Sequence, residues 1–273
     1  MTGLEKAQAL RYAIVERHAK SQDERRHPRQ SHHAGDSEAC LRRLHYAWHN
    51  YAGDNPRFRG GMANTMGEAA EKTFAAQLLT EAFGEDRVIL RRSVSQLVGL
   101  YELRGKIDFM LNLSPKDWQQ FFPHYASSEV PVEVKSFRSK GYEDIILRGP
   151  YAAHIGQLNS YVILTNAPFG LLMPVQREAT EGTPFDLWLS PPNQPRFDLV
   201  IARLRKLERW LELDVVPPPM CPAPNKLDSG CPFAGPRCVS DGGWPSHTCA
   251  GCGGSLSPLE VGWHARCQAL LEG

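Results

Sequence analysis

Hydrophobic and polar residues alternate along this chain with two different periods. In four stretches the apolar residues recur about every 3.6 positions, which is typical of helices with one buried face. Two residues indicate helix ends. Ser37 can cap a further helix that runs to about Tyr51, and Gly84 can end the helix over 64–83. The four periodic stretches cover residues 4–20, 64–83, 151–165 and 195–213.

Shorter runs rich in β-branched and apolar residues lie between these helices and predict strands. A short helix is expected near 115–122, between two of these runs. The alternation of helices and strands indicates an α/β fold in which a central mixed β-sheet is flanked by helices. The predicted strands cover residues 87–92, 94–103, 105–112, 130–137, 168–175 and 185–189.

Two stretches depart from these patterns and suggest the domain limits. Residues 21–36 are polar, which predicts a mobile linker in which His32 and His33 face solvent. After Val216 the composition turns to Cys, Gly and Pro, which cannot bury a conventional core. We therefore expect an N-terminal helix and linker in 1–36, a core in 37–240 and a Cys-rich metal-binding tail in 241–273 of the 273 residues.

Charge and hydropathy exclude several classes of protein. The net charge is +1, so contacts with a polyanion must come from local arginine-rich patches rather than from a global field. No apolar stretch approaches the ~20 residues of a membrane-spanning helix, and no signal-peptide core opens the chain. We expect a cytoplasmic protein, whose seven cysteines are then better suited to metals than to disulfides.

Two predicted strands carry residues suited to hydrolytic chemistry. Asp108 follows Gly105-Lys106-Ile107, and Glu133 and Lys135 flank Val134. Side chains two apart on a strand point to the same face, so Glu133 and Lys135 lie together. Two carboxylates and an ammonium at strand ends can hold a hard cation and a positioned water, as metal-assisted phosphodiester hydrolysis requires.

Two further motifs accompany this set in a fixed order. Gly67-Glu68-Ala69-Ala70-Glu71 lies in a predicted helix ahead of Asp108, and Gln157 and Tyr161 lie one turn apart on a later helix. Each motif alone occurs widely in unrelated proteins. Their ordered combination resembles the PD-(D/E)XK nuclease superfamily, in its RecB-like branch, whose core is restriction-endonuclease-like.

The resemblance implies a role for each motif residue. Asp108 and Glu133 would bind Mg²⁺ or Mn²⁺ with the carbonyl of Val134, and Glu71 would add a carboxylate. Glu71 departs from the branch, where histidine is frequent at this position. Lys135 would position the attacking water and neutralise the phosphate. The catalytic set that the resemblance implies is Glu71, Asp108, Glu133, Lys135, Gln157 and Tyr161.

A cysteine near the start of the core extends the resemblance. Cys40 opens Cys40-Leu41-Arg42-Arg43-Leu44-His45-Tyr46, which is similar to a segment of iron–sulfur RecB-like nucleases, including the CRISPR-associated adaptation nucleases and the AddB-type subunits. In that group one N-terminal and three C-terminal cysteines hold a 4Fe-4S cluster. The implied ligands are Cys40, Cys221, Cys231 and Cys238, although the C-terminal spacing is looser than usual. A buried core thiol is the alternative for Cys40.

The remaining cysteines form a second set at the C-terminus. Cys249 and Cys252 make one close pair, and His264 and Cys267 make another. Two close pairs of thiolate and imidazole ligands separated by a loop are typical of structural Zn²⁺ sites, so we expect a zinc knuckle.

These features together predict a Mg²⁺- or Mn²⁺-dependent deoxyribonuclease, most simply an exonuclease acting on DNA ends or single strands. DNA repair, recombination, phage DNA processing and CRISPR adaptation all remain open, with a helicase or integrase as a possible partner. A catalytically silent DNA-binding or assembly subunit with the same fold is the main alternative. A zinc or iron transcription or redox factor would leave the ordered carboxylates unexplained.

Overall fold

The computed structural model describes residues 29–37, 39–51, 71–112, 114, 129–177 and 185–217. The chain divides into two compact units. The larger unit contains Ser31–Ala39 and Thr65–Arg205, and the other contains Cys40–Asn64 and the chain from Lys206 onward, together with the N-terminal residues. The predicted domain limits fall mostly outside the described residues and stay predictions.

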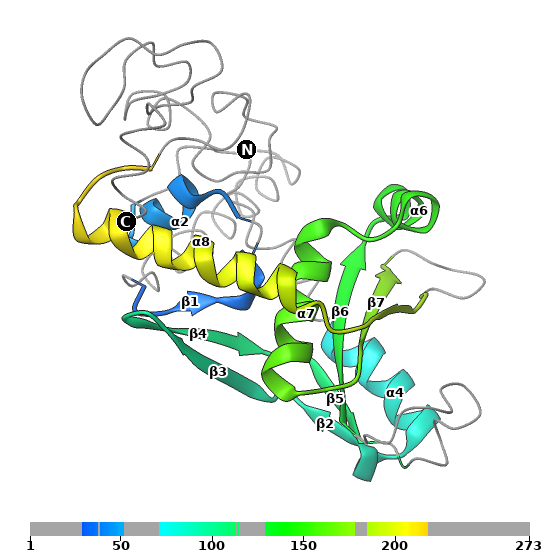
Figure 1. Ribbon diagram of the computed structural model, residues 1–273. Helices are drawn as coiled ribbons and strands as arrows, with labels where there is room; N and C mark the ends of the chain where they lie inside the picture. Colours follow the sequence, from blue (N-terminus) through cyan, green and yellow to red (C-terminus); the bar gives the residue numbers. More distant parts are fainter. Residues whose placement is uncertain are drawn as a thin grey trace, which may run out of the picture. The chain divides into compact units, whose positions relative to one another are not determined.

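A five-stranded mixed sheet forms the centre of the larger unit (Figure 1). Its members, in spatial order, are β2 (Val88–Leu90), β5 (Phe109–Asn112), β6 (Glu129–Phe137), β7 (Gly170–Gln176) and β8 (Trp188–Ser190). β6 and β7 run parallel, whereas every other neighbouring pair is antiparallel. The parallel pair is joined by the helices α6 (Ser139–Arg148) and α7 (Ala152–Thr165), since parallel strands require a crossover connection.

Helices cover both faces of this sheet. Val132 and Val134 of β6 pack in one apolar cluster with Ala75 and Leu79, which belong to the π-helical turn η3 (Glu71–Ala75) and to α4 (Ala76–Phe83). On the opposite face, Leu158 and Val162 of α7 pack on Leu172 of β7. The predicted α/β class, with a central mixed sheet flanked by helices, is confirmed.

A three-stranded sheet lies beside it in the same unit, with the order β1 (His32–His33), β4 (Tyr101–Lys106) and β3 (Ser93–Val98). The prediction of one strand over 94–103 is wrong, because β3 and β4 form an antiparallel hairpin. Gly99 turns the chain with a φ of 58°, which glycine adopts without strain. The predicted strand over 105–112 is likewise two strands, which separate at Ile107 and Asp108.

The prediction of a mobile linker over 21–36 is wrong for its described part. β1 pairs in parallel with β4, and the 3₁₀ turn η1 (Ala34–Asp36) follows it. His32 is buried, contrary to expectation, whereas His33 is exposed as predicted. The partners of this segment lie about 70 residues further on in the sequence, and local polarity does not reveal such pairing.

Most predicted helices are present, with some shifted ends. Gly84 ends α4 as expected, and α7 and α8 (Gln194–Glu212) match their predicted ranges closely. Ser37 does not cap the next helix, because it ends η1, and α2 (Leu41–Trp48) begins after Cys40. α6 was not predicted. The expected helices over 4–20 and 115–122 lie outside the described residues.

The second unit contains α2 and the C-terminal part of α8. Tyr46 and Trp210 are buried there, and the guanidinium of Arg42 donates a hydrogen bond to the carbonyl of Pro217. Lys206 holds its ammonium 5.6 Å from the centroid of the Trp210 ring. Among the helices that the structure describes, none is long and apolar enough to cross a membrane.

Candidate functional site

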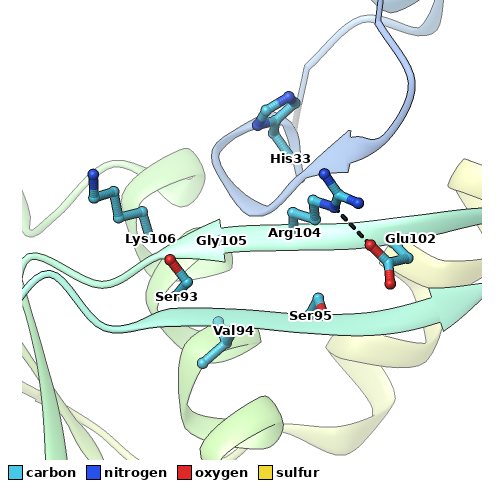
Figure 2. Close-up of a pocket in the computed structure, with 8 residues that line it drawn as sticks. All are labelled: His33, Ser93, Val94, Ser95, Glu102, Arg104, Gly105 and Lys106. Carbon is cyan, nitrogen blue, oxygen red and sulfur yellow. Dashed lines mark hydrogen bonds and ion pairs between the residues drawn. The ribbon is translucent and has the colours of Figure 1, made fainter.

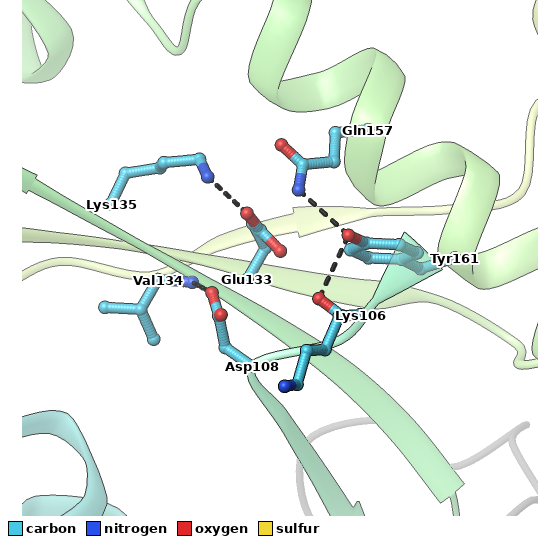
Figure 3. A network of polar contacts seen from close by, with 7 residues as sticks. All are labelled: Lys106, Asp108, Glu133, Val134, Lys135, Gln157 and Tyr161. Carbon is cyan, nitrogen blue, oxygen red and sulfur yellow. Dashed lines mark hydrogen bonds and ion pairs between the residues drawn. The ribbon is translucent and has the colours of Figure 1, made fainter. Parts of the chain in front are cut away.

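Strand pairing brings the two predicted carboxylates together. Phe109 of β5 pairs with Val132 of β6, so continuation of this antiparallel register places Asp108 opposite Glu133. The two side chains are close enough for Glu133 to affect the pKa of the Asp108 carboxyl. The backbone N–H of Val134 also donates to Oδ2 of Asp108 at 3.0 Å, which fixes this carboxyl against β6 (Figure 3).

Burial controls the ionisation of this pair. Glu133 is 1% exposed. Burial raises the pKa of Asp108 above its usual value, while the Val134 N–H and the charges of Lys135 and Arg91 act in the opposite direction. Asp108 is half-buried. Two neighbouring carboxyls of which one is fully buried favour a shared proton or a bound cation, because two adjacent negative charges repel each other.

Lys135 provides one positive charge beside these carboxyls. Its side chain lies on the same face of β6 as Glu133, and its ammonium donates a hydrogen bond to Oε1 of Glu133. The Lys135 side chain is 25% exposed, in contrast to that of Glu133. The ammonium therefore lies between the buried carboxylate and solvent, where it can meet an anionic substrate.

Helix α7 supplies the third side of the site. Gln157 Nε2 donates to the Tyr161 hydroxyl at 2.9 Å, and that hydroxyl donates to the backbone carbonyl of Lys106 at 3.1 Å (Figure 3). Burial and the charge of Glu133 raise the pKa of Tyr161, which keeps the hydroxyl protonated and able to donate. The hydrogen-bonded chain connects α7 to the backbone two residues before Asp108.

Glycines allow this close approach of helix and strand. A Cβ added to Gly105 of β4 would collide with the ring of Tyr161 and approach Ala34 of η1. A Cβ at Gly35 would stand 3.6 Å from Oε1 of Gln157. The segment around η1, which the sequence presented as a linker, therefore lies against the Gln157 end of the site.

The donor set at this site fits a divalent cation. Carboxylate oxygens are the ligands that Mg²⁺ and Mn²⁺ prefer, and a cation would allow both Asp108 and Glu133 to ionise in contact. Within the described residues, no group of three or more His, Cys, Asp or Glu side chains comes together to hold a metal ion. Glu71 lies in η3, but its side chain is not among those described. The roles of Glu71 and of the Val134 carbonyl stay predictions.

A polar groove of about 490 Å³ opens over β3 and β4 (Figure 2). It contains two cationic side chains, Arg104 and Lys106, and the hydroxyls of Ser93 and Ser95. Arg104 forms an ion pair with Glu102 on the groove wall at 2.6 Å. Cations and hydroxyls are the groups that contact phosphates in protein–DNA interfaces.

Of the predicted iron–sulfur and zinc ligands, Cys40 alone lies among the described residues. Cys40 is half-buried at the N-cap of α2, where its carbonyl accepts a hydrogen bond from the N–H of Leu44 at 3.0 Å. The other predicted ligands lie outside the described residues: Cys221, Cys231, Cys238, Cys249, Cys252, His264 and Cys267.

Three residues near the carboxylates had no role in the sequence analysis. Arg91 acts on Asp108 electrostatically and donates its backbone N–H to the Asp108 carbonyl at 3.0 Å, from a left-handed conformation. The backbone carbonyl of Lys106 accepts a hydrogen bond from the Tyr161 hydroxyl. His154 lies close enough to Lys135 for the ammonium to affect its pKa. The spacing of three residues between His154 and Gln157 could have indicated a shared helix face.

Comparisons with known proteins give structural neighbours only. No protein-family model matches the sequence, and no curated protein matches it. The chain is similar to the crystal structure of SSO0001, with 15% identity and a TM-score of 0.48, over 76% of this chain and 88% of that one.

It is also similar to an alkaline exonuclease, LHK-Exo, from Laribacter hongkongensis. That match has 13% identity and a TM-score of 0.46, over 67% of this chain and 91% of the other. The structure of LHK-Exo in complex with dAMP matches with 12% identity and a TM-score of 0.48, over the same shares of 67% and 91%. Similarity at this level assigns no activity to the present chain.

Proposed function

We propose that the protein is a divalent-metal-dependent deoxyribonuclease that hydrolyses phosphodiester bonds at DNA ends or in single strands, as an exonuclease. The observation that carries the proposal is the meeting of Asp108, Glu133 and Lys135 on one face of β6. Glu133 and Lys135 are neighbours on this face, and the pairing of β5 with β6 brings Asp108 opposite Glu133, which is almost fully buried. The ordered sequence motifs support the same conclusion.

The cation would be held by Asp108 and Glu133, with Glu71 and the Val134 carbonyl as further ligands implied by the sequence resemblance. When bound, a divalent cation lowers the pKa of a coordinated water and stabilises negative charge on the phosphate. Either Mg²⁺ or Mn²⁺ suits this set of oxygen ligands.

The protein's own residues would align the reactants. Lys135, held by Glu133 and partly exposed, would receive a phosphate oxygen and orient the attacking water. Gln157 and Tyr161 would act as positioning residues, because they fix the Lys106 carbonyl and thereby the backbone that carries Asp108. A catalytically silent DNA-binding subunit remains the alternative, but such a protein has no need for the acid pair of Asp108 and Glu133.

The test is cleavage of end-labelled single- and double-stranded DNA by the anaerobically purified protein. We expect cutting in Mn²⁺ or Mg²⁺, none in EDTA, and none by Lys135→Ala, which should fold normally. Arg148→Ala, which removes an exposed basic side chain from the C-terminal end of α6, is the matched control and should cut like wild type. Cutting by Lys135→Ala at the wild-type rate would exclude this active site, and binding without cutting by wild type would favour the silent subunit.

We further propose the two cysteine sites that the sequence suggests, a 4Fe-4S cluster on Cys40, Cys221, Cys231 and Cys238 and a Zn²⁺ knuckle on Cys249, Cys252, His264 and Cys267. A brown protein with visible absorbance that Cys231→Ser loses, together with about one zinc per chain that Cys252→Ser loses, is the expected result. A colourless, zinc-free wild type after anaerobic purification would contradict both sites.

A further inference from the structure

An aromatic cluster extends the active-site face of β6 beyond Lys135. Phe137 lies two residues after Lys135 and therefore on the same face of the strand. Its ring centroid is 5.7 Å from that of His154 and 6.2 Å from that of Tyr151, and Tyr151 and His154 meet edge to face at 5.4 Å. These separations lie in the range of attractive aromatic contacts.

Two rows of side chains face each other here. Glu133, Lys135 and Phe137 follow one another along β6. On α7, His154, Gln157 and Tyr161 share a helix face at spacings of three and four residues. Tyr161 lies near Glu133, whose charge raises the Tyr161 pKa. His154 lies near Lys135, whose charge lowers the His154 pKa, and its ring contacts that of Phe137. The cluster is therefore continuous with the acid pair.

We propose that Phe137, Tyr151 and His154 form a stacking site for an unpaired nucleobase of the DNA strand whose phosphate lies at Lys135. This inference rests on the proposed function and narrows its substrate to single strands or frayed ends. Every base presents a π-face to an aromatic side chain, so stacking of this kind holds single strands without selecting a sequence.

Exposure distinguishes this cluster from ordinary core packing. Tyr151 is 47% exposed at the N-cap of α7, and Phe137 and His154 are half-buried. A cluster that served only to pack the helix on the sheet would bury its rings. His154 Nδ1 is buried and has no hydrogen-bond partner among the residues that the structure describes.

Charge around the cluster suits a polyanionic strand. Arg138 and Lys140 follow Phe137 in the chain, and both are exposed. Lys135 lies on the other side of the Phe137 position. Burial and the Lys135 ammonium lower the pKa of His154 to about 4, which leaves its ring neutral near pH 7 and suitable for stacking. A base on the rings would thus have cationic side chains within reach of both flanking phosphates.

The experiment uses single-stranded oligonucleotides that each carry one 2-aminopurine, with the full-length protein in Ca²⁺ in place of Mn²⁺ to limit cutting. Stacking changes the fluorescence of this base, so wild type should give a signal at one defined position. Tyr151→Leu should lose the signal and bind the strand about 10-fold more weakly, while Tyr151→Phe, which keeps the ring, should match wild type. In Mn²⁺, Tyr151→Leu should raise KM for single strands more than it lowers kcat.

The outcomes separate the two proposals. Position-specific signals that are the same in wild type and in both Tyr151→Leu and His154→Leu would overturn the stacking site. Cleavage of DNA without any position-specific signal would also overturn it and would leave the nuclease proposal intact. Failure of the wild type either to bind or to cut these strands would overturn both.

Discussion

The two faces of β6 carry very different side chains. On one face, Val130, Val132 and Val134 are fully buried among apolar side chains of η3, α4 and β7. On the other face, Glu133 pairs with Lys135 and lies close to Tyr161 of α7. Neighbouring residues in the sequence therefore have unrelated roles, because successive side chains on a strand point in opposite directions.

This difference teaches how a buried charged site is supported. The apolar face fixes β6 between β5 and β7, so that register alone brings Asp108 to Glu133. Burial of the Glu133 carboxyl is unfavourable by itself, and stability on the apolar face offsets this cost. Substitutions on the two faces should therefore separate loss of activity from loss of stability.

The largest expected effect is on the charged face. Glu133→Gln keeps the shape of the side chain but removes the proposed cation ligand and the partner of Lys135, so cleavage should fall by at least about 10²- to 10³-fold, the scale on which loss of one electrostatic contact at a reaction centre acts. The melting temperature should change little. Initial rates on end-labelled DNA, with circular-dichroism melts, make the comparison.

Glu129→Gln is the matched control, since Glu129 lies on the same strand but is partly exposed and pairs with Arg92. It should cut at nearly the wild-type rate. Equal losses in Glu129→Gln and Glu133→Gln would mean that the two ends of the charged face of β6 are not functionally distinct.

The next effect is on the apolar face. Val132→Ala removes two buried methylene equivalents from the cluster and should lower the free energy of unfolding by about 2 kcal/mol. Below its melting temperature the variant should cut normally. Denaturant unfolding and initial rates on the same preparations test this, and a variant that is stable but inactive would contradict the division.

An effect on both properties at once is expected where β4 meets α7. In Gly105→Ala the new methyl group meets the Tyr161 ring, so the helix or the strand must shift, which costs about 1–3 kcal/mol in well-packed sites. The Tyr161 contact with the Lys106 carbonyl should weaken, and kcat should fall with stability. Unchanged activity and melting would show that the hydrogen-bonded chain from α7 is not needed.

The smallest effect concerns pH. The pKa of His154 is lowered to about 4, from 6.5 in an ordinary environment, first by burial and then by Lys135. As the pH falls from about 6.5 towards 4, the unfolded chain binds a proton that the folded chain does not, so the folded state loses stability. His154→Leu should not lose stability in this way. Its melting temperature relative to that of wild type should therefore rise as the pH is lowered from 7.5 to 5. Melting temperatures that differ by the same amount at both pH values would contradict the assignment.

The sequence predicts much of the acid pair and less of its surroundings. Asp108, Glu133 and Lys135 could be predicted because strand alternation is visible in short stretches of sequence and because the motifs follow one another in a recognisable order. The hairpin of β3 and β4 was missed because Gly99 is followed by Leu100 in a continuous apolar run, without the usual Asn-Gly signal.

Other features depend on contacts between distant segments. His32 is buried only because β1 pairs with β4, and nothing within 21–36 indicates that pairing. His154 gains a role only because α7 places it against Phe137, which the sequence separates from it by a helix that was itself unpredicted. Periodicity predicts which face of an element is buried, but it does not identify the partner.

Calorimetric titration of the metal-free chain with Mn²⁺, for wild type and for Asp108→Asn, tests the central claim that Asp108 and Glu133 come together to hold a divalent cation. We expect saturable binding by wild type that strengthens as the pH rises, because burial raises the pKa of Asp108 and a proton competes with the ion. Asp108→Asn should lose this binding. Equal Mn²⁺ affinity in the two proteins would contradict the account.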